Sequence, residues 1–241
     1  MPTHHYHIYS GGAIGIDEYA EQCAKECGMH MHVIVPPHHS RSKFITPLRP
    51  EDLHEAEPHL KRVAQRTGKH LFTPNTFSRH LQLRNFHIVK LAAAVYAFGY
   101  FQNQMLRDVS DISVGPDGIN LTATCSIPLQ SANVKGGTGW TVQLAVDQHK
   151  PIYFYNIPEK RWYQYHADHY YWNEHQWLSD NGFLPMQGSP TLHKHSAVVG
   201  SRHPTPEALA EVKRLFQTTS SLENILDNQR DIYCLLPEHG D

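Results

Sequence analysis

The sequence predicts an α/β fold in which a mostly parallel sheet carries helices on both faces. Strand-like apolar runs alternate with helix-like runs along most of the 241 residues, a spacing typical of strands joined by crossover helices. Two of these strands lead into the motifs at 10–17 and 198–205, in which a glycine-containing turn opens a helix. Such turns normally follow one another in a nucleotide-binding fold, but here they lie at opposite ends of the chain. We therefore predict a circularly permuted, Rossmann-like domain.

Each predicted element rests on its hydrophobic periodicity and on the residue that begins or ends it. Gly28 and Gly68 are expected to end helices, Thr76 to cap the start of one, and Pro204 to lie in a first turn. The predicted strands are 4–10, 31–35, 92–98, 151–155, 196–200 and 231–236, and the predicted helices are 16–27, 51–67, 76–91, 135–149 and 204–217.

Three segments depart from this alternation. The polar, proline-punctuated stretch 36–50 predicts a long surface loop, and 102–134 predicts a hairpin insert around the turn signal Pro116-Asp117-Gly118. Residues 159–195 hold three of the four tryptophans and predict a small appended lid or oligomerisation segment. Their irregularly spaced aromatic residues favour packing over stacking on nucleic-acid bases. We expect one domain over 1–241.

Composition limits the classes of function. The chain carries 21 basic and 23 acidic residues, so no uniform basic field attracts nucleic acid, and 20 histidines make its charge depend on pH between about 5 and 7.5. The four cysteines form no CxxC pair, and no signal peptide or long apolar run is evident, which favours the cytoplasm and no membrane. Cys23 and Cys27 fit a helix core better than a metal site, and no histidine pattern has closed zinc spacing. We expect no metal and no cofactor.

Four motifs carry a resemblance to a known superfamily. They are Ser-Gly-Gly-Ala-Ile-Gly-Ile-Asp at 10–17, Arg84-Asn85 before an apolar strand, Gly136 to Gly139 before a helix, and Gly200-Ser201-Arg202. In this cyclic order they resemble the SLOG superfamily, which includes the DNA-processing protein A family, the lonely-guy nucleotide hydrolases and the YpsA-like proteins. The Val-Gly-Ser-Arg element, which comes first in proteins like DNA-processing protein A, lies near the C-terminus here, at 199–202. This order resembles the circularly permuted YpsA-like branch.

The motifs predict a phosphate-binding crevice. Glycine turns let the backbone approach a ligand, helix N-termini and threonine hydroxyls can hold phosphate oxygens, and arginine can pair with phosphate bidentately. The alternatives are tight packing at each glycine, a solvated Arg84, and a salt bridge at Arg202. The predicted ligand-binding residues are Ser10, Gly11, Gly12, Ala13, Gly15, Arg84, Asn85, Gly136, Gly137, Thr138, Gly139, Thr141, Gly200, Ser201 and Arg202.

The resemblance leaves catalysis open. Lonely-guy hydrolases carry Pro-Gly-Gly-x-Gly-Thr-x-x-Glu, whose glutamate helps to cleave an N-glycosidic bond. Here Lys135, Trp140 and Gln143 replace the proline, the threonine and the glutamate. A neutral amide cannot act as a general base, so Asp17 or Glu18 is the predicted catalytic carboxylate if the protein is an enzyme.

We therefore expect a nucleotide or nucleotide-derived ligand, with N-glycoside hydrolysis as a possible activity. The alternative is a single-stranded-DNA-binding recombination mediator of the DNA-processing protein A type. A homo-oligomer is expected in either case.

Overall fold

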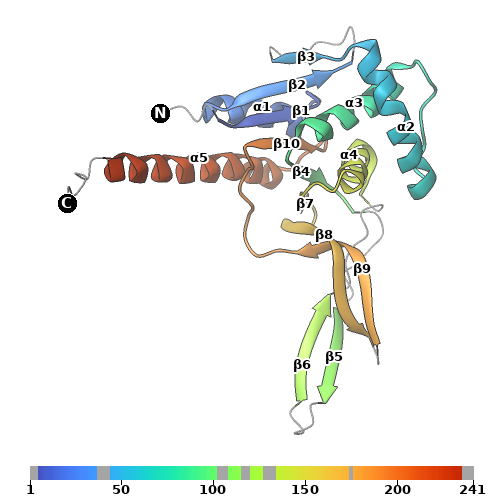
Figure 1. Cartoon of the computed structure of the whole chain (residues 1–241), viewed down its shortest axis with the longest axis vertical. Coiled ribbons are helices and arrows are strands. Elements are labelled where there is room, and N and C mark those ends of the chain that lie inside the picture. Colours follow the sequence, from blue (N-terminus) through green and yellow to red (C-terminus); the bar gives the residue numbers. More distant parts are fainter. Residues whose placement is uncertain are drawn as a thin grey trace, which may run out of the picture.

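An eight-stranded sheet forms the centre of the molecule in the computed structural model (Figure 1), which describes residues 5–36, 44–101, 108–114, 120–126, 134–173 and 176–234. Its strand order is β3-β2-β1-β10-β4-β7-β8-β9. The pairs from β3 to β7 are parallel, and β8 and β9 are antiparallel additions. The strands are β1 (His7–Ser10), β2 (His30–Val35), β3 (Ile45–Pro47), β4 (Ala94–Gly99), β7 (Ile152–Asn156), β8 (Arg161–Asn173), β9 (Gln176–Pro185) and β10 (His195–Gly200).

Helices cover both faces of this sheet, as the sequence predicts. On one face, α1 (Ile16–Glu26) and α5 (Pro206–Cys234) pack on strand residues such as Ile8 and Val198. On the other face, α2 (Pro50–Thr67), α3 (Phe77–Leu91) and α4 (Gly136–Asp147) pack on residues such as Val95 and Ala197. The alternation of buried residues along each strand thus divides the apolar core into two layers. The α/β fold class is confirmed.

Two strands that are far apart in the sequence lie side by side in the middle of the sheet. Strand β1 pairs in parallel with β10, with Ile8 opposite Ser196 and Tyr9 opposite Ala197. The predicted adjacency of 4–10 and 196–200 is therefore confirmed. Because both strands run in the same direction, the turns that follow them leave from the same carboxyl edge of the sheet.

Most helix ends follow the local signals in the sequence. Gly68 ends α2 with a left-handed φ of 68°, a conformation that glycine adopts without the steric cost of a Cβ. Thr76 begins α3, and its side-chain hydroxyl accepts a hydrogen bond from the Arg79 amide at 3.2 Å.

Two predictions about the elements are wrong. The predicted strand 231–236 is helical as far as Cys234, because α5 continues from Pro206 without interruption. No glycine or proline lies between Pro206 and Pro237, so nothing local ends the helix earlier. The predicted loop 36–50 contains β3, which pairs with β2 at the edge of the sheet, where a proline is tolerated.

The two unusual segments add further strands. The 102–134 segment contains the antiparallel hairpin of β5 (Asp108–Val114) and β6 (Asn120–Ser126), which confirms the hairpin insert, although its predicted turn lies outside the described residues. The 159–195 segment forms β8 and β9, which extend the main sheet rather than standing apart from it (Figure 1). Its predicted role as a lid or oligomerisation segment stays a prediction.

The first aromatic residues of that segment are packing residues. Trp162 and Tyr163 are buried, and each donates a hydrogen bond to a glutamate, Glu211 and Glu159 respectively. The remaining aromatic side chains at 170–177 lie outside the described residues. Among the helices that the structure describes, none combines the length and the apolar character needed to cross a membrane.

Candidate functional site

A cavity of about 640 Å³ lies at the carboxyl edge of the sheet, where the turns after β1 and β10 meet α3 and α4. Ligands bind at this edge in open α/β sheets. The cavity brings together residues from all four sequence motifs. The predicted ligand-binding residues that line it are Ala13, Arg84, Asn85, Gly136, Gly137, Thr138, Thr141, Gly200, Ser201 and Arg202.

The remaining predicted ligand-binding residues do not line this cavity. They are Ser10, Gly11, Gly12, Gly15 and Gly139; Gly12 lines a smaller neighbouring cavity of about 170 Å³.

Close packing against a neighbouring backbone carbonyl accounts for two of these glycines. A Cβ at Gly15, whose φ is 102°, would lie 2.4 Å from the Ser201 carbonyl oxygen, and one at Gly139 would lie 2.1 Å from the Val134 carbonyl oxygen. A Cβ at Gly136 or Gly137 would meet no atom within 4 Å. Of the three glycines in the Gly136 to Gly139 turn, Gly136 and Gly137 therefore have open space where a side chain would lie.

Asp17 joins the two turns at the centre of the sheet. One of its carboxylate oxygens accepts hydrogen bonds from the amides of Gly11 and Ala13, at 3.2 and 3.4 Å, and the other accepts from Gly200 at 2.9 Å. Burial raises the pKa of this carboxyl, and Arg84 and the backbone donors oppose that effect. The amides of Gly11 and Ala13, which the sequence predicts to contact a ligand, thus already donate to the Asp17 carboxylate. The predicted catalytic role of Asp17 stays a prediction.

The second predicted catalytic residue is less well placed. Glu18 is exposed and does not line the cavity. Gln143, which stands where the hydrolases have their glutamate, is buried on α4 and also does not line it. Its side-chain oxygen accepts a hydrogen bond from Arg66 at 3.0 Å. Among the described residues that line the cavity, Asp17 is the sole carboxylate.

Two arginines face the cavity. Arg84 is only 7% exposed, donates to the Gly11 carbonyl oxygen, and has a buried Nε with no hydrogen-bond partner in the described part of the chain. Burial lowers the pKa of its guanidinium, Asp17 opposes this, and the positive charge of Arg202 lowers it further. Arg202 is exposed and lines both cavities. This arrangement leaves two like charges next to an open space.

The N-terminus of α4 forms another wall. The helix begins at Gly136, and the first amide groups of a helix have no acceptor within it. No side chain caps this end, because Lys135 at the N-cap has no capping hydrogen bond. Lys69 lies beside it and donates to the Val134 carbonyl oxygen at 2.9 Å, and burial lowers the pKa of its amine. Sequence reasoning missed Lys69, since nothing in the loop after Gly68 marks it as a site residue.

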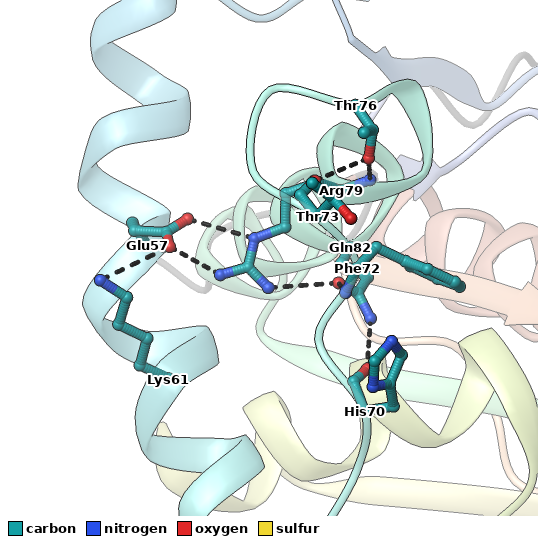
Figure 2. A network of polar contacts seen from close by, with 8 residues as sticks. All are labelled: Glu57, Lys61, His70, Phe72, Thr73, Thr76, Arg79 and Gln82. Atoms are coloured by element: carbon teal, nitrogen blue, oxygen red, sulfur yellow. Dashed lines mark hydrogen bonds and ion pairs between the residues drawn. The ribbon is translucent and has the colours of Figure 1, made fainter.

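A buried polar network holds the wall formed by residues 69–72 (Figure 2). Arg79 is 2% exposed and donates to both carboxylate oxygens of Glu57, at 2.6 and 3.3 Å. It also donates to the side chain of Gln82, which in turn accepts from the Phe72 amide and donates to the His70 carbonyl oxygen. The network therefore ties this loop to α2 and to the first turns of α3. No local pattern in the sequence marks this network.

Several histidines gather at the opposite edge of the sheet. His7 stacks on His30, His32 and His195, with ring centroids 5.2, 5.2 and 4.9 Å away. The described residues contain one group with three potential metal-ligand atoms close together, namely Asp52, Glu55 and His87. Its carboxylates already pair with Arg49 and Lys90, and His87 Nε2 donates to the Asp52 carbonyl oxygen.

Comparisons of the chain with protein-family models, with curated proteins and with solved structures found no match. The resemblance to the SLOG superfamily therefore stays a prediction.

Proposed function

We propose that the protein binds a phosphate-bearing ligand, a nucleotide or nucleotide derivative, in the 640 Å³ cavity. The observation that carries this proposal is the pair Arg84 and Arg202. Two guanidinium groups face one space, and one of them is buried with an unused donor. A phosphate between them would pair with both guanidinium groups and remove the repulsion between the two charges.

The other walls support the same ligand chemistry. Lys69 and Lys135 add positive charge beside the open end of α4, where amide groups and the helix dipole favour an anion. Asp17, the one carboxylate among the described residues that line the cavity, already accepts three backbone hydrogen bonds. The site therefore suits recognition of an anion, and we propose binding rather than N-glycoside hydrolysis as the primary activity.

Titration calorimetry with nucleoside mono- and diphosphates tests this proposal. Arg202→Gln should weaken binding about 10- to 100-fold, because hydrogen bonds to charged groups contribute about 1.5–3 kcal/mol. The thermal midpoint should not fall, since no hydrogen bond or ion pair to this side chain occurs among the described residues. Arg62→Gln, which removes an exposed arginine from α2, is the matched control and should bind as the wild type does.

Two results would contradict the proposal. One is the absence of binding by any nucleotide in the panel, and the other is an unchanged affinity in a folded Arg202→Gln protein. Chromatography of the same mixtures for released base distinguishes binding from hydrolysis.

A further inference from the structure

The smaller cavity of about 170 Å³ continues the ligand site toward apolar residues. It shares Ala13, Leu81, Arg84 and Arg202 with the larger cavity, so the two are adjacent. The walls that it does not share include Ile14 and Phe77. This cavity therefore combines an apolar lining with the same two guanidinium groups that face the phosphate site.

Its apolar residues are unusually exposed. Ile14 is 56% exposed and Phe77 is 50% exposed, and Phe72, on the rim of the larger cavity, is 46% exposed. Half of the large hydrophobic residues that are exposed in the described part of the chain thus border these two cavities. Exposed apolar groups that gather around a concave site mark a surface that a ligand covers.

Two separate elements hold these side chains. Phe77, Leu81 and Arg84 are spaced i, i+4 and i+7 on α3, so they form one stripe along that helix. The turn after β1 supplies Ile14, and the turn after β10 supplies Arg202. The cavity is thus a slot between a helix stripe and two turns.

The start of α3 is well anchored. Thr76 caps it, and Arg79 in its first turn is fixed by Glu57 and Gln82 (Figure 2). Phe77 lies between these two anchored residues, so its backbone position does not depend on its own side chain. The helix therefore presents an exposed aromatic ring at a fixed place beside the cationic site.

We propose that this slot is the subsite for the nucleobase of the ligand, with Phe77 and Ile14 contacting the base while the two arginines contact the adjoining phosphate. This inference rests on the proposed function. An aromatic ring and a guanidinium plane both stack on a planar base. A flexible acyl chain has no planar face for such stacking, so these side chains favour a base. Phe77 and Ile14 are then specificity-determining residues.

Calorimetry with three phosphate ligands tests the inference: a nucleoside monophosphate, ribose 5-phosphate and an alkyl phosphate. The wild type should bind the nucleotide at least about tenfold more tightly than ribose 5-phosphate, because stacking on an aromatic residue contributes about 1–3 kcal/mol per base. Phe77→Ala should remove most of that preference and leave the affinity for ribose 5-phosphate unchanged. Ile14→Ala should reduce the preference in the same direction.

Leu91→Ala is the matched control, because Leu91 lies on the same helix, is 46% exposed and lines neither cavity. It should retain the full preference for the nucleotide. Equal wild-type affinities for the nucleotide and ribose 5-phosphate would overturn the base subsite while leaving phosphate binding intact. So would a Phe77→Ala protein that keeps the preference, or an alkyl phosphate that binds as tightly as the nucleotide and depends equally on Phe77. If none of the three ligands binds, the proposed function fails as well.

Discussion

Asp17 is the residue on which the two central turns depend. Its carboxylate connects the turn after β1 to Gly200, a residue 183 positions away in the sequence. Its two oxygens accept from three backbone donors, of which the Gly11 amide is buried and the Ala13 and Gly200 amides are partly buried. It also lies next to the charge of Arg84. An acidic residue at the start of a helix, which the sequence presents as a catalytic candidate, thus acts in the structure as a link between turns.

Asp17→Asn should therefore lower the free energy of unfolding by about 1–3 kcal/mol, as expected when a buried or partly buried donor is left without its acceptor. The amide NH₂ cannot accept a hydrogen bond, so at least one backbone donor loses its acceptor. Urea denaturation followed by circular dichroism measures the loss. Glu18→Gln, a change in the neighbouring exposed residue, should alter the stability by less than about 0.5 kcal/mol. Wild-type stability in Asp17→Asn would contradict this linking role.

At the scale of elements, the glycines at the start of α4 have two different roles that the sequence alone could not distinguish. The Gly136 to Gly139 turn has one face toward the cavity and another against the loop before it. An added Cβ at Gly137 meets open space, whereas one at Gly139 would meet the Val134 carbonyl oxygen and the Lys69 amine. Glycine at one position leaves room for a ligand, and glycine at the other allows close packing.

Substitutions at these two glycines should consequently affect different properties, ligand affinity at Gly137 and stability at Gly139. Gly137→Val should fold with a stability within about 1 kcal/mol of the wild type, yet lose at least about tenfold in nucleotide affinity because its side chain enters the cavity. Gly139→Ala should lose about 2 kcal/mol or more of stability because backbone must move to admit the methyl group. Thermal unfolding and calorimetry on both variants provide the comparison. Unchanged nucleotide affinity in a folded Gly137→Val protein would remove this turn from the site.

The sequence predicted the elements better than it predicted the roles of individual residues. Periodicity and end signals such as Gly68 and Thr76 act locally, so they predicted the helices and most strands. The adjacency of 4–10 and 196–200 follows instead from the two glycine-containing turns, which we expect to face one crevice. Lys69 and Arg79 depend on contacts between elements that no local pattern encodes. The end of α5 was misjudged because a short apolar run fits both a strand and a buried helix segment.

At the scale of the whole molecule, the two edges of the sheet differ in chemistry. The carboxyl edge holds the cationic cavity, while the amino edge holds the histidine cluster of His7, His30, His32 and His195. Three of these side chains form a row across β2, β1 and β10, because His7 lies opposite both His30 and His195. The parallel pairing of β1 with both β2 and β10 produces this row, since it places the first residues of the three strands side by side.

This cluster should make the protein less stable as the pH falls. Nδ1 of His7 and Nε2 of His32 lie 2.9 Å apart, and such a hydrogen bond needs one nitrogen without a proton. Burial and the neighbouring histidines lower the pKa of His7 and of His32 below the usual 6.5. The unfolded chain therefore binds more protons than the folded one below about pH 6.5, so the stabilisation is complete above that pH and is lost progressively as the pH decreases toward the lowered values.

Urea unfolding at a series of pH values between about 7.5 and 5 measures this dependence. His7→Gln should flatten the profile, because it removes the central ring of the row and relieves the repulsion that lowers the pKa of His32. His54→Gln, a change at an exposed position on α2, should keep the wild-type slope. Nucleotide affinity at constant pH should be the same in the wild type and His7→Gln, because the cluster and the cavity lie at opposite edges of the sheet. A wild-type profile in His7→Gln would show that the acid sensitivity arises elsewhere in the chain.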